Sequence, residues 1–272
     1  MRLKTGITKK EIVVFLVCLI FLMINVGAIS SEGRRLAKRA VCLANLKQLT
    51  LAWTQFANDN DGFIVNGAAG IFQPNEPPWV NKDWNDPYGS GHIIPKDFRE
   101  KAIKEGALWP YCRELKLYHC PNGYPFELRN YSIVDGMNGS PRNGTIEGIH
   151  WIKKMEQIRR PARRAVFIDE GWITPDSFAV VFNQEVWWDD PPVRHGDGTT
   201  LSFADGHSVW HRWKGRWTVA YGLATIGTHP QNLYPPGTPL PDGTIVPATS
   251  ADYEDLYWLQ RVCWGELGYT PH

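Results

Sequence analysis

Uninterrupted apolar residues fill the chain from Ile12 to Ile24, and after Asn25 the run resumes for a few residues. Beyond it, the residues up to Asn58 are first charged and then amphipathic. We therefore predict one continuous helix over 7–58. A bilayer core of about 30 Å is crossed by about 20 apolar residues, so the apolar run is at the short end for a membrane-spanning helix.

The amphipathic part of this helix has one apolar face. Residues spaced by four, three, four and three positions lie on the same side of a helix, and five residues follow this spacing: Cys42, Leu46, Leu49, Trp53 and Phe56. We expect this face to pack against a sheet. The helix should end within the sequence Asn-Asp-Asn-Asp-Gly at 58–62, where Gly62 can adopt a left-handed backbone.

Shorter periodic segments are separated by loops rich in Gly, Pro and Asn over 63–106 and 228–248. A short helix is predicted from Lys96 to Glu105, and a last helix from Ser250, whose hydroxyl can cap it, to Trp264. Apolar and β-branched residues predict strands over 130–133, 165–170, 200–204 and 208–213. The Asp-Gly pair between the last two strands is a strong hairpin signal.

Composition narrows the classes of function. The region 59–272 is long enough for one large domain with a substantial core. A net charge of +1 gives no electrostatic basis for binding nucleic acid, so we expect no nucleic-acid partner. The 13 tryptophans and 20 prolines predict many turns, with either a tryptophan-rich core or exposed aromatic surfaces. Five cysteines permit disulfides in an exported chain.

The residues before the apolar run carry a recognisable motif. Gly6, Ile7, Thr8 and Glu11 resemble the processing site of type IV prepilins and pseudopilins. The resemblance implies cleavage after Gly6 by a prepilin peptidase and methylation of Ile7. It places Glu11 at the fifth mature position, where the family's acid pairs with a neighbouring subunit's terminal amine. The lysines at 9 and 10 stand where the family has apolar residues.

Three later motifs resemble pseudopilin-like families of planctomycete and lentisphaerate bacteria. They are Cys42-Leu-x-Asn-Leu-Lys-Gln-Leu, a Cys120-Pro pair closing a short strand from Leu117, and His195 followed after nine residues by Asp205-Gly206. The last is similar to the "H-X9-DG" prepilin-associated domain. Because Cys42 and Cys120 both fall in family-like motifs, we expect them to form a disulfide that ties the helix to the head.

The resemblance implies a pilin-like α+β fold, in which a long N-terminal transmembrane-to-periplasmic helix packs on an antiparallel sheet with long loops. The expected parts are a leader (1–6), the helix (7–58) and an extracytoplasmic head (59–272) with a hairpin at 195–206. Basic residues before the apolar run favour a single-pass inner-membrane protein with a cytoplasmic N-terminus and a periplasmic or extracellular head. The implied function is a non-enzymatic subunit of a type II secretion or type IV pilus-like assembly, whose partners are other pilin-like subunits and secretion machinery.

Other interpretations stay open. The N-terminal segment could be a plain membrane anchor in which Glu11 is an interfacial charge, or a signal peptide cut after Ala28. The competing function is a membrane-tethered module whose tryptophan-rich head binds extracellular polysaccharide. A hydrolase built on His195 and Asp205 ranks third.

Two groups of residues are candidates for chemistry. His195 and Asp205, with Asp169 or His207, could bind a cation or act as acid and base. We favour a structural role, in which Asp205 caps its own turn and a hydrogen bond from His195 to Asp205 locks the hairpin. A second group, Asp189, Asp190 and Asp197, could hold calcium through oxygen ligands, and we expect no other cofactor.

Overall fold

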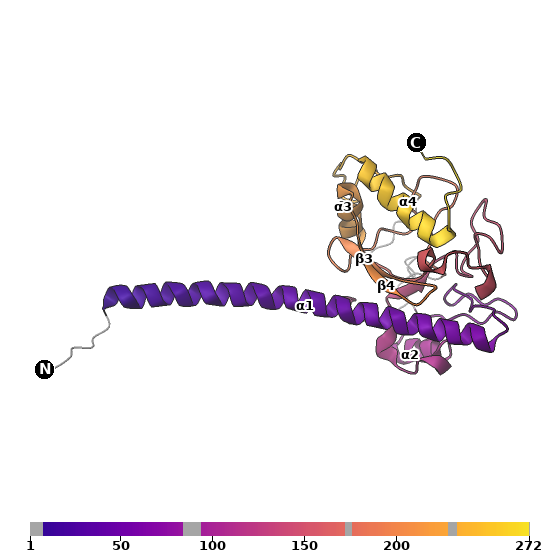
Figure 1. Cartoon of the computed structure of the whole chain (residues 1–272), viewed down its shortest axis with the longest axis horizontal. Coiled ribbons are helices and arrows are strands. Elements are labelled where there is room, and N and C mark those ends of the chain that lie inside the picture. Colours follow the sequence, from indigo (N-terminus) through magenta and orange to yellow (C-terminus); the bar gives the residue numbers. More distant parts are fainter. Residues whose placement is uncertain (1–7, 84–93, 172–175, 228–232, 272) are drawn as a thin grey trace.

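The protein is described here from a computed structural model, which covers residues 8–83, 94–171, 176–227 and 233–271. Its mixed α+β class with an antiparallel sheet is as predicted. A long helix, α1 (Lys9–Asp59), projects from a compact head (Figure 1). The C-terminal part of α1 packs within this head. The helix begins with a capping box, because Thr8 and Glu11 each bind the backbone N–H of the other.

The N-terminal part of α1 exposes its apolar side chains. Every residue from Ile12 to Ile24 is exposed, including Phe15 at 67% and Phe21 at 66% of its surface. Within the part of the chain that the structure describes, no helix is both long and apolar enough to cross a bilayer.

The described residues of the head form one sheet of four strands in the order β1-β2-β3-β4, and each neighbouring pair is antiparallel. The strands are β1 (Tyr131–Ile133), β2 (Ala165–Asp169), β3 (Gly198–Phe203) and β4 (Ser208–Arg212). These positions agree with the predicted strands to within a few residues. A register shift between Ala165 and Ile168 bends β2 against β3.

The apolar face of α1 packs on this sheet, as predicted. All five residues of the stripe are buried, four of them completely. Polar pairs also cross this interface, two of them between α1 and β3. Thr50 Oγ1 donates to Ser202 Oγ at 2.7 Å, and Cys42 Sγ lies 2.9 Å from Thr200 Oγ1. Because Thr200 and Ser202 are two positions apart on β3, both side chains point toward the helix.

Helices α3 (Arg216–Thr225) and α4 (Ser250–Trp264) lie across the sheet from α1 (Figure 1). The predicted short helix is α2 (Lys96–Lys104). Short 3-10 helices occupy the connections: η1 (Trp109–Tyr111), η2 (Leu115–Tyr118), η3 (Met155–Gln157) and η4 (Pro161–Arg163).

Two local predictions were wrong, and one helix was missed. The strand expected from Leu117 to the Cys-Pro pair is instead η2 followed by a turn, where the Asn130 side chain accepts from Cys120 N in place of a strand partner. Helix α3 was not predicted. The cap of α4 is Thr249 rather than Ser250, because Asp252 three residues later completes a capping box with Thr249.

Candidate functional site

The two ends of the H-X9-DG motif lie at opposite ends of β3. His195 precedes the strand and Asp205 follows it, so the strand's six residues separate them by about 20 Å. The expected hydrogen bond between them was therefore wrong. Asp205 does cap its own turn, since Oδ1 accepts from His207 N at 3.2 Å and lies 2.5 Å from His207 Nδ1. Gly206 has the positive φ of 92° that the turn requires.

His195 instead contacts Asp169 at the end of β2. Its Nε2 lies 3.1 Å from Asp169 Oδ2 and 3.2 Å from Cys120 Sγ, and its side chain is completely buried. Burial opposes the imidazolium form, but hydrogen bonds to Asp169 and Cys120 outweigh it and raise the pKa of His195 to about 9. When no ion is bound to it, this imidazole is therefore a cation at neutral pH, paired with a buried carboxylate.

The register of the strands explains why α1 contacts the His195–Asp169 pair. Tyr131 on β1 is directly opposite Asp169, and the next strand contributes Thr200 one position beyond the Ile168 pairing. These three side chains form a row under Cys42 on α1. Tyr131 Oη donates to Cys42 Sγ at 3.1 Å, and Cys42 Sγ lies 3.8 Å from Asp169 Oδ2.

The result is a buried cluster of Cys42, Cys120, Asp169 and His195, whose ligand atoms all lie within 4.8 Å of one another. Both cysteines are free thiols in this structure, so the expected disulfide stays a prediction. A hydrogen bond with Cys42, burial and the charge of Asp169 together raise the pKa of the Cys120 thiol. All four side chains are closed off from solvent, so the cluster has no room for a substrate.

Arg194 forms one wall of this cluster. Its guanidinium donates to Glu127 Oε1 at 2.7 Å and to the carbonyl oxygens of Glu170 and Gly171. Its Nε also lies 3.7 Å from Asp169 Oδ1, an oxygen that accepts no hydrogen bond within the described chain. Burial disfavours the charge of Arg194, but Asp169 and Glu127 outweigh it and raise the pKa. The charged groups around the cluster are thus paired, and Asp169 Oδ1 is the carboxylate oxygen that accepts no hydrogen bond within the described chain.

The three aspartates considered for calcium do not form a shared site in the described structure. Asp189 is buried and accepts from Ala179 N, Asp190 accepts from Tyr234 Oη, and Asp197 forms an ion pair with Arg212 on the surface. Each carboxylate already has its own partner. Of the processing residues, Gly6 and Ile7 lie outside the described residues.

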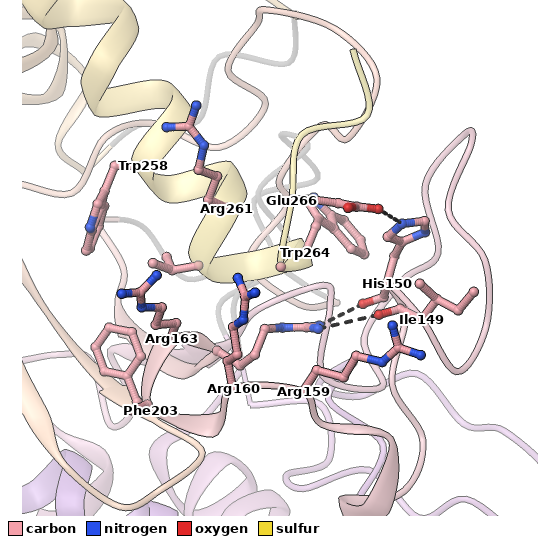
Figure 2. A pocket seen from close by; sticks show the side chains of 14 residues that line it. Ile149, His150, Arg159, Arg160, Arg163, Phe203, Trp258, Arg261, Trp264 and Glu266 are labelled. Carbon is pink, nitrogen blue, oxygen red and sulfur yellow. Dashed lines mark hydrogen bonds and ion pairs between the residues drawn. The ribbon is translucent and has the colours of Figure 1, made fainter. Parts of the chain in front are cut away.

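A second candidate site is a cavity of about 620 Å³ between α4, η4 and the hairpin. Five arginines line it, together with aromatic residues: Arg159, Arg160, Arg163, Arg164, Arg261, Phe203, Trp258 and Trp264. Figure 2 shows three of the arginines along one rim, with Arg261 across from them on α4. The only acid in the lining, Glu266, is paired with His150 at 2.8 Å.

Most of these arginines are available to a ligand. Arg164 is buried and donates to the carbonyl oxygens of Ile149 and His150. Arg159, Arg160 and Arg163 are exposed, and none has an ion pair with another described residue. Arg160 holds a left-handed backbone with φ of 54°, an uncommon conformation for a non-glycine residue. The cavity is suited to an anion that also has an apolar or ring-shaped part.

This cavity was not predicted. The basic run Arg-Arg-Pro-Ala-Arg-Arg over 159–164 is visible in the sequence and could have indicated it. Its aromatic wall comes from α4 and the hairpin, which are distant in the chain. Comparison of the chain with protein-family models, curated proteins and solved structures gave no match.

Proposed function

We propose that this chain is a non-enzymatic, pilin-like subunit of a type II secretion or type IV pilus-like assembly, held in the inner membrane through the N-terminal part of α1. The observation that carries the proposal is the contrast along one helix. From Cys42 onward α1 is part of the core of the head, whereas the apolar side chains from Ile12 to Ile24 are all exposed.

An exposed apolar segment of this length needs an apolar partner, because such patches are rare on soluble monomers. Lipid and the equivalent helices of neighbouring subunits are both suitable, since α1 projects far enough from the head for either to reach it (Figure 1). The capping box gives Glu11 a local role at the helix start. In an assembled filament, a neighbouring terminal amine would compete with Thr8 for this carboxylate.

Site-specific photocrosslinking tests the proposal. A photoreactive phenylalanine analogue at Phe15 or Phe21, in cells that hold the assembly machinery, should crosslink to pilin-like subunits. The same analogue at Phe98, which is 62% exposed on α2 of the head, is the matched control and should give none of these products. Crosslinks to lipid alone would favour a plain anchor, and recovery of a soluble chain beginning at Ile29 would establish a signal peptide.

The arginine-lined cavity favours a second function, the binding of an acidic extracellular polysaccharide by the tethered head. Guanidinium groups bind carboxylates and sulfates through paired hydrogen bonds, and aromatic faces such as Trp258 pack on sugar rings. The two functions are compatible, because α1 contributes none of the residues that line the cavity in the described structure.

Dextran sulfate and neutral dextran provide matched probes for the cavity. The full chain in detergent should bind only the sulfated polymer. Arg163→Gln combined with Arg261→Gln should weaken that binding at least tenfold, since each charged hydrogen bond contributes about 1.5–3 kcal/mol. Arg113→Gln, an exposed arginine outside the cavity, should bind normally. Equal binding of neutral dextran, or an unchanged double variant, would exclude this function.

A further inference from the structure

We infer that Cys42, Cys120, Asp169 and His195 form a zinc site that fastens α1 to the head. The inference is independent of any filament or polysaccharide. It rests on the distances among four donor atoms, on their chemical types and on the groups that surround them.

The separations fit a tetrahedral ion. Bonds of about 2.0–2.3 Å from zinc to nitrogen, oxygen and sulfur place neighbouring ligand atoms roughly 3.3–3.8 Å apart. The His195 Nε2–Asp169 Oδ2 distance is 3.1 Å, the His195 Nε2–Cys120 Sγ distance is 3.2 Å, and the Cys42 Sγ–Asp169 Oδ2 distance is 3.8 Å. All pairs lie within 4.8 Å, so small side-chain movements complete the tetrahedron.

The donor set selects the metal. Two cysteine sulfurs, one imidazole nitrogen and one carboxylate oxygen are ligands that zinc accepts in tetrahedral sites. Calcium and magnesium prefer oxygen ligands alone, so the two thiols disfavour them. Because four protein ligands fill the coordination sphere and all are buried, this would be a structural zinc without an open position for a substrate.

The surrounding groups support ligands in the metal-bound state. Tyr131 Oη donates to Cys42 Sγ, and Thr200 Oγ1 lies 2.9 Å from the same sulfur, so two hydroxyls can stabilise a thiolate. Arg194 offsets the negative charge of Asp169. Metal-bound histidines hold their ring through the second nitrogen. His195 Nδ1 lies 3.2 Å from Asn122 Nδ2, which also donates to Arg194 O at 2.9 Å. In the metal-bound state the Asn122 amide would rotate, giving up the bond to Arg194 O, to present its oxygen to Nδ1–H.

Zinc and the Cys42–Cys120 disulfide are mutually exclusive, because both use the same two sulfurs. Either would join α1 to the loop at Cys120, but only zinc would also join them to β2 and to the segment before β3. The Asp169 carboxylate and the His195 imidazole beside the two thiols are unnecessary for a disulfide. They are what a fourfold zinc site requires, and this difference favours the metal.

The test measures zinc in the full chain, purified in detergent without chelator or added reductant. We expect about one zinc ion per chain, which a strong chelator should remove. Replacement by Co²⁺ should give the visible bands of a tetrahedral ion and a thiolate charge-transfer band. His195→Gln and Cys42→Ser should each lower the zinc content to less than about one-tenth of this level.

Cys112→Ser is the matched control, because Cys112 is buried outside the cluster, where its sulfur contacts Leu108 O and Tyr118 Oη. It should keep its zinc and its cobalt spectrum. The wild-type measurement alone also decides the matter if a ligand variant fails to fold. A wild-type chain without zinc would overturn the inference, whether Cys42 and Cys120 are joined or reduced.

Discussion

At the residue scale, His195 and Asp205 are set apart by their surroundings. The His195 imidazole is enclosed by Asp169, Cys120 and Asn122, whereas Asp205 lies at an exposed hairpin tip with His207. The motif therefore marks both ends of β3 rather than one pair. Its His end fixes a buried contact with Asp169 and Cys120, and its Asp-Gly end closes the turn.

This difference predicts unequal losses of stability. His195→Ala leaves Asp169 as an uncompensated buried charge and should cost about 3–5 kcal/mol. Asp205→Ala removes only a turn cap and an exposed pair and should cost about 1 kcal/mol. Urea unfolding of the full chain in chelator measures both free energies. Equal losses, or a larger loss for Asp205→Ala, would contradict the placement of His195.

The raised pKa of Asp190 predicts that the free energy of unfolding depends on pH. Burial raises its pKa to about 7, despite hydrogen bonds from Tyr234 and Thr225. Because this pKa is above the ordinary 3.8, the folded state holds the proton more tightly than the unfolded state. The stabilisation is present in acid and is lost as pH rises from about 4 to 7, by about 2–4 kcal/mol.

The measurement is the difference between the pH–stability curves of wild type and Asp190→Asn. The asparagine variant should lack this fall. Asp242→Asn, at an exposed turn where Asp242 accepts from Thr244 N, is the control and should keep it. A difference curve that rises between pH 4 and 7 would show that Asp190 is ionised in the folded state.

Individual residues of the buried cluster could be identified from the sequence, but their proximity in the fold could not. Cys42 stood out by helical spacing, and Cys120 and His195 stood out by motif. Their contacts depend on the register of β1, β2 and β3, which places Tyr131 and Asp169 opposite one another under α1. Local patterns do not encode this register. Thr8 and Glu11 are the reverse case, because their spacing is that of a capping box and could have been read directly.

At the element scale, the Asp252 side chain caps the N-termini of two helices, α3 and α4. One carboxylate oxygen accepts from the Thr249 backbone and hydroxyl at the start of α4, and the other accepts from Thr218 N and Oγ1 in the first turn of α3. The cap of α3 is Gly215, where an added Cβ would lie 2.0 Å from Asp252 Oδ1. A residue far along the chain thus performs the capping that Gly215 cannot.

Gly215→Ser should therefore destabilise the protein, although serine is normally a better helix cap than glycine. The new Cβ would displace Asp252 and remove caps from both helices, at a cost of more than about 2 kcal/mol. Gly33→Ser on the exposed side of α1, where a Cβ meets nothing within 4 Å, is the control and should be nearly neutral. Thermal unfolding of the two variants would decide, and a stabilised Gly215→Ser would refute this role of Asp252.

The source of each element's stabilising contacts explains which elements were predictable. Elements with their own periodicity and caps, such as α1, α4 and the β3–β4 hairpin, were found near their true bounds. Helix α3 was missed because its cap comes from α4 and its sequence, RWTVAYGLAT, has no clear apolar stripe. The segment before Cys120 looked like a strand, but no strand among the described residues pairs with it, and it forms η2.

At the scale of the whole molecule, the processing prediction is independent of the head. Cleavage between Gly6 and Ile7 with methylation of Ile7 should appear in the intact mass of chain made together with a prepilin peptidase. Gly6→Val should keep its leader, because a bulky residue blocks the cleavage that the family's glycine permits, and it should stay in the membrane fraction. Thr5→Val, one residue earlier, is the control and should be processed. An uncut wild-type chain would remove the basis for a pilin-like subunit.

The continuity of α1 also has a mechanical consequence. Its 51 residues make a rod of about 76 Å, and each residue turns the rod by about 100°. About 15 residues separate Ile24 from Arg39, which contacts the head through His195 O. The angular position of the head is therefore set by the number of residues in this spacer. One inserted residue would rotate the head by about a quarter-turn around the helix axis, relative to the N-terminal part of α1. Seven inserted residues would return the head to nearly its original orientation and move it about 10 Å further along the axis.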